Sequence, residues 1–330
     1  MKKKIIAACL LFGLYAGAAE VADAPQASIT NGQLTASLYL PDANKGYYQA
    51  TRFDWSGLVK SLEYKGHSYF GVWFDNYNPK THDAVTGPVE SFAPLNYDAA
   101  KPGGTFVDIG VGVLRKPVER GYQSFKLYDI VDGGKWTVTT KDDRVIYKQE
   151  LHDSTGYAFT YTKTVRLVKG KPEMVLEHSL KNTGTKAIET EVFDHNFPVL
   201  DKEPTGPNMQ IVFPFEIKPD GQGMKGWGTI GKINGRILNF TRELTKREQV
   251  YSPGFLGLTG TAKDYDFKIE NLKTGAGMHI KGDQPLEKLV YWACPTTACP
   301  EPYIKISVAP GKEMKWNIDY EFYTFTPESK

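Results

Sequence analysis

The chain has 330 residues, 13% of them aromatic, which is enough apolar material for a large hydrophobic core in one or two domains. Its 40 Lys and Arg residues nearly balance its 38 Asp and Glu residues, so no net charge favours binding to nucleic acid or to anionic lipid. We therefore expect a ligand that is neutral or modestly polar.

The N-terminal segment has the features of a secretory signal peptide. Three lysines at 2–4 precede an apolar run at 5–15, and small residues at 16–18 provide a cleavage site. Because the apolar run is too short to span a bilayer, we expect no transmembrane segment. The sequence predicts that residues 1–19 are removed as a signal peptide. Residues 20–330 then form one domain in the periplasm or outside the cell.

Alternating apolar and polar residues predict β-strands through most of the mature chain. The predicted strands occupy residues 34–40, 125–130, 136–140, 144–152, 157–168, 173–180, 187–197, 303–308 and 314–325. Turn sequences separate them, including a hairpin turn at 169–172 and an Asn-Thr-Gly turn at 182–184. No stretch keeps helical periodicity for three turns, so the pattern is typical of an all-β sandwich or barrel.

The longest irregular stretch, residues 76–104, contains aromatic residues such as Phe92 and Tyr97. A linker between domains would be poorer in aromatics, whereas long loops on a β scaffold often contribute to function. We therefore interpret residues 20–330 as a single domain with a functional loop.

One predicted strand has an unusual face. With a period of two, Glu191, Phe193, His195 and Phe197 point to the same side of the strand at 187–197. Two aromatic rings with a carboxylate and an imidazole suit the floor of a sugar pocket, where rings cover C–H faces and polar groups meet hydroxyls. The alternative is a histidine at the edge of the core that a neighbouring carbonyl satisfies.

Two cysteines, Cys294 and Cys299, remain in the predicted mature chain. An even pair in an oxidising compartment predicts a disulfide bond that closes a small loop. A metal-binding pair is the weaker interpretation, because no other Cys and no His lies nearby in the sequence.

Several segments resemble the aldose 1-epimerase, or galactose mutarotase-like, superfamily. Residues 161–200 resemble its central segment, with a long strand pair, an Asn-Thr-Gly turn and a strand that ends in a His near a Phe. The Pro-Gly-Lys-Glu turn at 310–313 and the aromatic strand after it resemble the closing turn and last strand of the family. Cys299-Pro300-Glu301-Pro302 matches a Cys-x-Glu-Pro motif of its sugar-phosphate branch. The resemblance implies a large antiparallel β-sandwich, the galactose mutarotase-like supersandwich.

The resemblance also implies a chemistry, the interconversion of sugar anomers. Opening a hemiacetal requires a base for the anomeric hydroxyl and an acid for the ring oxygen. By this resemblance His195 is the acid and Glu301 the base, and no metal or organic cofactor is needed. The alternative for Glu301 is an ordinary glutamate in an exposed loop.

Family members hold the sugar with an Arg and a second His from an early region, which implies Arg52 and His82 here. We group Trp55, Glu90, Phe193 and His178 with them as candidate sugar-binding residues. The family's Asn-Arg element and its His-Gly-Gly motif are both missing from this chain.

Other functions remain open. The aromatic-rich segment at 55–92 is larger than a monosaccharide requires, which favours a non-catalytic protein that binds glycans or assists polysaccharide processing. A polysaccharide lyase could recruit Tyr161, His178 and Arg166, and a metal site could recruit Glu191, Asp194, His195 and Asp201, but no fixed spacing supports either. We expect a mono- or oligosaccharide as the ligand.

Overall fold

The computed structural model describes residues 24–118, 121–221 and 223–327, and within them the chain is almost entirely β-structure. The largest sheet is antiparallel and has ten strands. In spatial order they are β16 (Gly231–Asn234), β17 (Ile237–Phe240), β14 (Met209–Val212), β20 (Asp266–Asn271), β21 (Ala276–Gly282), β24 (Glu313–Thr324), β12 (Glu173–Asn182), β11 (Ala158–Leu167), β10 (Arg144–His152) and β9 (Lys135–Lys141).

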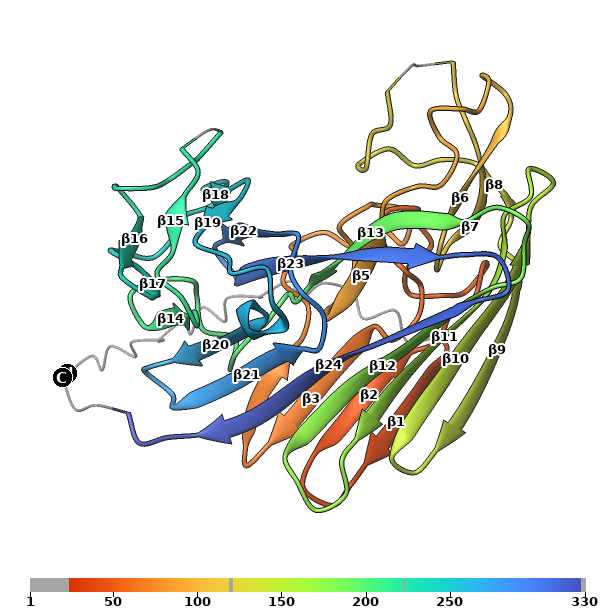
Figure 1. Ribbon diagram of the computed structural model, residues 1–330. Helices are drawn as coiled ribbons and strands as arrows, with labels where there is room; N and C mark the ends of the chain where they lie inside the picture. The colour runs from red at the N-terminus through yellow and green to blue at the C-terminus, as the bar shows by residue number, and fades with distance from the viewer. Residues whose placement is uncertain (1–23, 119–120, 222, 328–330) are drawn as a thin grey trace, which may run out of the picture.

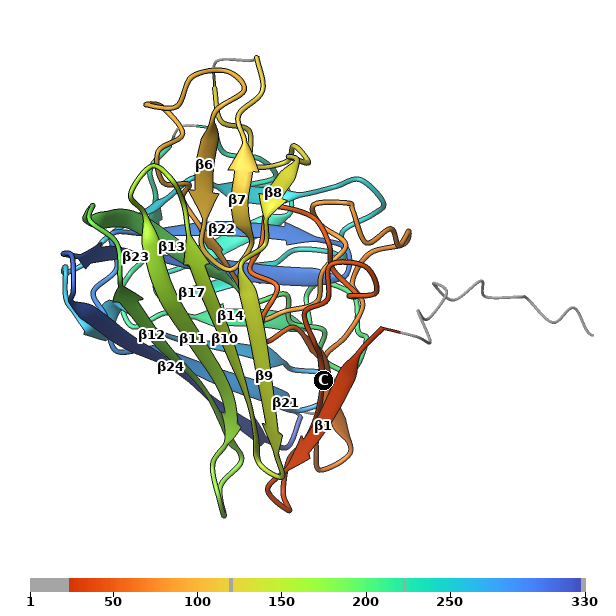
Figure 2. The same ribbon diagram turned by 90° about the vertical axis from the view of Figure 1, so that its right-hand side faces the viewer.

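A five-stranded antiparallel sheet lies over this large sheet, as Figures 1 and 2 both show. Its order is β18 (Val250–Ser252), β22 (Lys288–Cys294), β23 (Thr297–Val308), β13 (Ile188–His195) and β5 (Val89–Phe92). The main hydrophobic core includes side chains of both sheets, such as Tyr147 of β10, Leu176 of β12 and Ile306 of β23.

Three smaller sheets complete the described structure. The first contains β1 (Gln26–Thr30), β2 (Thr35–Tyr39), β3 (Val59–Tyr64) and β4 (His67–Phe70). The second contains β6 (Thr105–Asp108), β7 (Gly112–Arg115) and β8 (Ile130–Asp132). The third pairs β15 (Lys218–Pro219) with β19 (Phe255–Leu256). One short 3-10 helix, η1, covers Ala262–Asp264.

Strand periodicity predicts most of these elements because one face of each long strand is buried. In β24, Trp316, Ile318, Tyr320 and Phe322 are buried and alternate with exposed polar residues. The predicted strand at 144–152 coincides with β10, and that at 187–197 contains β13. The fold-class prediction of an antiparallel β-sandwich is confirmed.

The strand predicted at 125–130 is wrong except for its last residue, where β8 begins. The chain turns there, with the Lys126 amide donating to the Gln123 carbonyl at 3.0 Å. The Tyr128 amide donates to Thr51 Oγ1 at 3.1 Å instead of joining a strand ladder. Phe125 and Leu127, which give this stretch its apolar alternation, are 60% and 47% exposed, so the pattern does not reflect a buried strand face.

The predicted signal peptide, residues 1–19, lies outside the described residues. No helix in the described part of the chain is long and apolar enough to cross a membrane.

Candidate functional site

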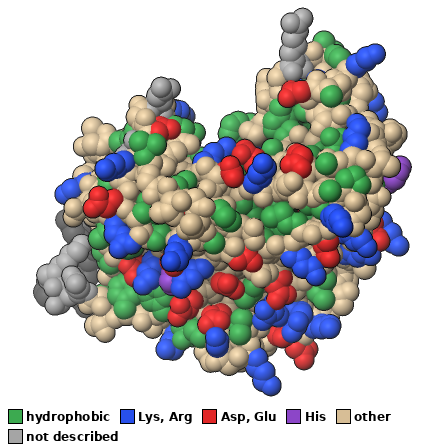
Figure 3. Space-filling model, in the orientation of Figure 1, with side chains coloured by type: hydrophobic (Ala, Val, Ile, Leu, Met, Phe, Trp, Pro, Cys, Tyr) green, Lys and Arg blue, Asp and Glu red, His purple; other side chains and the backbone are tan. Residues whose placement is uncertain are grey.

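The main cavity of the described structure has a volume of about 770 Å³ and opens on the outer side of the five-stranded sheet. Strands β5, β13, β22 and β23 contribute its floor, and loops at 52, 73, 83, 121–125 and 225–253 contribute its walls. Figure 3 shows the molecular surface hollowed between two projections, which correspond to the β6–β8 region and the β15–β19 region in Figure 1. A cavity of this size with mixed aromatic and polar walls is typical of a small-molecule site.

The predicted face of β13 lies on this floor. Glu191, Phe193, His195 and Phe197 all line the cavity. The side chain of Asp194, on the opposite face of β13, points into the protein, where Tyr320 Oη donates to its Oδ2 at 2.6 Å.

His195 and Glu301 meet at the cavity floor. Strands β13 and β23 pair with Phe193 opposite Tyr303, and two residues further along this antiparallel register His195 lies opposite Glu301. His195 Nε2 and Glu301 Oε1 are 3.4 Å apart, and the side chains are only 4% and 7% exposed. The two residues that the sequence predicts as acid and base therefore converge on one place.

Aromatic rings fix the orientation of the imidazole. The His195 ring stacks on Phe197 with centroids 3.6 Å apart, and Phe197 stacks on Trp73 at 4.7 Å. The Trp292 ring lies edge-to-face with the imidazole, with centroids 5.7 Å apart. His195 Nδ1 is buried without a hydrogen-bond partner among the described residues, so Nε2 is the nitrogen that interacts with Glu301.

Burial moves the two pKa values in opposite directions. Loss of hydration lowers the pKa of His195 well below its usual value, and the positive charge of Arg52 lowers it further. Loss of hydration raises the pKa of Glu301 to about 7, although Arg52 opposes this effect. Near neutral pH the imidazole is therefore uncharged, and the carboxyl group exists in both protonation states.

Arg52, a candidate sugar-binding residue, lies on the cavity wall. Its guanidinium forms an ion pair with Asp83 and lies 4.5 Å from the ring centroid of Phe125. Its carbonyl accepts a hydrogen bond from Ser91 Oγ at 2.7 Å. His82 is not part of the wall; it lies behind it, with its Nε2 2.9 Å from Asp83 Oδ2 and its ring 5.0 Å, centroid to centroid, from that of Phe125.

Three other predicted sugar ligands lie in the interior and not on the cavity wall. Trp55 is 3% exposed, and its indole N–H donates to the Ala50 carbonyl at 2.8 Å. Glu90 and His178 bind each other, with His178 Nε2 at 2.7 Å from Glu90 Oε1. The inward position of Glu90 follows from its strand pairing. Its cross-strand partner is Asp194, and because cross-strand partners share one face of a sheet, Glu90 faces inward as Asp194 does.

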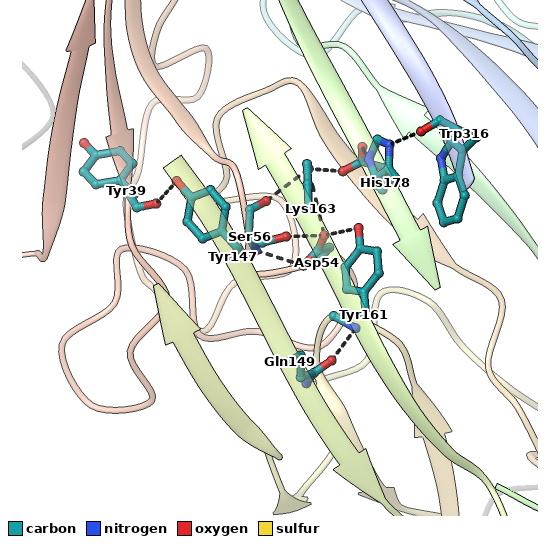
Figure 4. Close-up of polar contacts among 11 residues, drawn as sticks. Tyr39, Asp54, Ser56, Tyr147, Gln149, Tyr161, Lys163, His178 and Trp316 are labelled. Atoms are coloured by element: carbon teal, nitrogen blue, oxygen red, sulfur yellow. Dashed lines mark hydrogen bonds and ion pairs between the residues drawn. The ribbon is translucent and has the colours of Figure 1, made fainter. Parts of the chain in front are cut away.

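Glu90 and His178 belong to a buried ionic network that the sequence did not reveal (Figure 4). Lys163 forms an ion pair with Glu90, and its Nζ donates to the Ser56 carbonyl at 3.1 Å. Lys163 Nζ also lies 3.9 Å from Asp54 Oδ2, and Tyr161 Oη and Ser56 Oγ both donate to Asp54. Burial is the largest single effect and would raise the pKa of Glu90, but the electrostatic interactions and hydrogen bonds with Lys163 and His178 together outweigh it, and the net direction is downward.

The disulfide predicted between Cys294 and Cys299 is not formed, and both residues are free, buried cysteines. In the β22–β23 hairpin Cys294 pairs with Thr297, and Cys299 pairs with Trp292. The two cysteines are therefore diagonal neighbours, and diagonal side chains in an antiparallel pair are farther apart than the Cβ separation of a disulfide.

The alternative metal group is dispersed. Asp194 faces the interior, and Asp201 Oδ2 lies 2.8 Å from His67 Nδ1, away from the cavity. Among residues 24–118, 121–221 and 223–327, no three His, Cys, Asp or Glu side chains are grouped so as to hold a metal ion.

Comparison with solved structures identifies the fold. No protein-family model matches the chain, and no curated protein sequence does either. A galactose mutarotase related enzyme from Lactobacillus acidophilus superposes with a TM-score of 0.56 at 12% identity, covering 92% of this chain and 99% of the other. A GalM/aldose epimerase homologue from C. elegans superposes with a TM-score of 0.54 at 13% identity, covering 92% and 100%. The chain therefore has the galactose mutarotase-like fold that its motifs predict.

Proposed function

We propose that the protein binds a sugar in the cavity and interconverts its anomers at the His195–Glu301 pair. The observation that supports this most directly is the 3.4 Å approach of His195 Nε2 and Glu301 Oε1 at a buried floor. Two proton-transfer groups of unlike chemistry then face the same substrate position, which general acid–base catalysis requires. The names of the two similar structures, a mutarotase-related enzyme and an aldose epimerase homologue, are consistent with this proposal.

The proposed reaction opens and recloses a hemiacetal. One partner takes the proton of the anomeric hydroxyl while the other gives a proton to the ring oxygen, and the C1–O5 bond breaks to leave an open-chain aldehyde. Rotation about C1–C2 exposes the other face of the aldehyde. The ring then closes with both proton transfers reversed, so that the products are the other anomer and the original state of the pair.

For this reaction His195 Nε2 and the Glu301 carboxyl group must share one transferable proton. The family resemblance implies His195 as the acid and Glu301 as the base. Burial favours the uncharged arrangement, with a neutral imidazole and a protonated carboxyl group. We therefore propose that Glu301 holds the shared proton at rest, and that the acid and base roles exchange between ring opening and ring closure.

The surrounding side chains suit a pyranose ring. Phe193 stacks on Tyr303 with centroids 4.6 Å apart, and both line the cavity beside Trp292. Aromatic faces can cover the C–H surface of a sugar, and the guanidinium of Arg52 can donate to its hydroxyls.

The test is anomer exchange of freshly dissolved α-D-glucose, α-D-galactose and other aldoses, followed by NMR or optical rotation. We expect acceleration over buffer for at least one aldose, and its loss in His195→Ala and in Glu301→Gln. His67→Ala is a matched control, because His67 pairs with Asp201 outside the cavity. A panel with no acceleration at all would exclude the proposal for simple sugars.

A second candidate is a protein that binds glycans without catalysis. The several aromatic rings on the cavity wall favour it, since they would contact a sugar whether or not a reaction follows. Sugar binding by wild type that Glu301→Gln leaves intact, together with no anomer exchange, would select this candidate.

We also propose that the protein is exported, on the strength of its N-terminal sequence. Expression in a bacterium followed by fractionation tests this, with a periplasmic or secreted product that begins near residue 20. A cytoplasmic product that retains Met1 would contradict it.

A further inference from the structure

Two projecting segments extend the cavity beyond its catalytic floor. The first arm, residues 121–132, contributes Tyr122, Ser124 and Phe125 to the wall. The second arm, residues 223–256, contributes Lys225, Gln249, Tyr251 and Pro253. In Figure 1 these arms rise on opposite sides of the five-stranded sheet, and Figure 3 shows the hollow between them.

The first arm is held rigidly. The ring of Tyr122 stacks on Tyr128 with an interplanar angle of 4°, and the hydroxyl of Tyr128 accepts from the Gln123 amide at 2.9 Å. The Tyr128 amide in turn donates to Thr51 Oγ1, next to Arg52. Phe125 extends from this frame, 60% exposed at the rim of the cavity.

The second arm is held equally well. Tyr251 and Lys225 exchange two backbone hydrogen bonds of 3.0 Å, and the indole N–H of Trp227 donates to the Tyr251 carbonyl at 2.6 Å. Tyr251 also pairs with Trp292 of β22, whose ring lies beside His195. Both walls are therefore formed before a ligand arrives, which reduces the entropic cost of binding.

The charges of the walls largely cancel. Arg52 pairs with Asp83, and Lys288 Nζ lies 3.0 Å from Glu191 Oε1. Lys225 adds one further positive charge, and Glu301 on the floor opposes it when ionised. The small net charge that remains fits a neutral ligand better than a chain of uronates or phosphates. The size also exceeds that of one sugar: cavities of about 300–1,000 Å³ hold drug-sized ligands, which correspond to roughly two or three sugar units, and this one measures about 770 Å³.

We propose that the cavity binds the reducing end of a neutral oligosaccharide. The terminal sugar lies on His195 and Glu301, and the next one or two units lie between Phe125 of the first arm and Tyr251 of the second. Only the reducing-end unit has a free anomeric hydroxyl, so only this unit can undergo anomer exchange at the floor. This inference rests on the proposed function for the position of the terminal unit.

The test compares affinities along chain-length series by calorimetry. Suitable probes are glucose to cellotetraose, glucose to maltotetraose, and the corresponding β-1,4-galactose, β-1,4-mannose and β-1,4-xylose series. In at least one series we expect affinity to rise about tenfold or more from the monosaccharide to the trisaccharide, as additional aromatic contacts form. Oligogalacturonates of the same length should bind no more tightly than the neutral series.

Variants of the two arms then test whether the increase in affinity with chain length comes from the cavity walls. Phe125→Ala and Tyr251→Ala should each reduce trisaccharide affinity about fivefold to tenfold while changing monosaccharide affinity by less than about twofold. Leu127→Ala and Leu256→Ala are matched controls, since both are exposed apolar residues of the same arms that do not line the cavity.

Affinity that does not change with chain length overturns the inference, and so does a panel in which no member binds. Equal losses in the control variants, or tighter binding of the oligogalacturonates, would overturn it as well. Anomer exchange is measured on the same samples. Length-dependent binding without exchange supports the inference and rejects the proposed reaction, whereas exchange without length dependence rejects only the inference.

Discussion

Replacing Glu301 by Gln should stabilise the protein at alkaline pH while it removes the proposed activity. Burial raises the pKa of this carboxyl group from an ordinary 4.5 to about 7 in the folded chain. The folded state therefore holds the proton more tightly than the unfolded state does. The contribution of protonated Glu301 to the free energy of unfolding is fully present below about pH 4.5, declines as pH rises, and is lost above about pH 7.

The size of the effect follows from the two pKa values. They differ by about 2.5 pH units, and each unit corresponds to about 1.36 kcal/mol. Ionised Glu301 therefore costs the folded state about 3 kcal/mol above pH 7. Glutamine has the same shape and no charge to desolvate, so Glu301→Gln should be about 3 kcal/mol more stable than wild type at pH 8 and nearly equal to it at pH 4.

The assay is urea unfolding at several pH values between 4 and 9, with the free energy of unfolding compared between variant and wild type. Glu191→Gln is the control, because it removes a carboxylate of the same cavity whose side chain is 41% exposed. Its difference from wild type should change little with pH. The reasoning is refuted if the difference for Glu301→Gln is also independent of pH, or if this variant is the less stable one at pH 8.

Four further outcomes test other parts of the structure. Anomer exchange should fall as pH rises through about 7, because the catalytic pair then loses its one proton. Arg52→Met should move this decline to higher pH, as measured by NMR exchange, because Arg52 lowers the pKa of the cavity glutamate. Lys163→Met should cost about 3–5 kcal/mol in urea unfolding, since it removes the ammonium group that neutralises the buried carboxylates of Glu90 and Asp54, and adding Glu90→Gln should recover part of the loss. Cys294 and Cys299 should both react with a thiol reagent after unfolding without reductant, and reductant should leave the unfolding midpoint unchanged.

The sequence predicts the fold well because burial of one strand face leaves a period-two pattern. It predicts β10 and the inward face of β24 closely, and it fails at 125–130. There, Phe125 and Leu127 produce the same alternation as a strand, although they project from a loop and are exposed. A local pattern cannot distinguish these two origins, because the difference lies in hydrogen-bond partners far away in the sequence, such as Thr51 for Tyr128.

The candidate site is predicted in part. His195, Phe193, Arg52 and Glu301 line the cavity, and each lies in a recognisable strand or motif. The walls formed by Tyr122 and Tyr251 have no such signal. Tyr122 lies in a loop and Tyr251 in the three-residue strand β18, and the position of both depends on the whole sandwich. Conversely, the sequence suggests Glu90 and His178 as site residues because they are polar and lie in or beside predicted strands. In the structure Glu90 binds both His178 and Lys163 of β11, and no spacing rule connects the three residues.

The interior position of Glu90 links stability to the geometry of the site. The Glu90 carbonyl accepts from the Asp54 amide at 2.8 Å, and the next residue, Ser91, binds the Arg52 carbonyl. The ion pair with Lys163 thus fixes strand β5 against the segment that presents Arg52. Because β5 also pairs with β13 up to His195, the network determines where the guanidinium lies relative to the imidazole. Substitutions in this network should therefore alter the proposed activity indirectly, through the position of Arg52, even though Glu90 itself does not line the cavity.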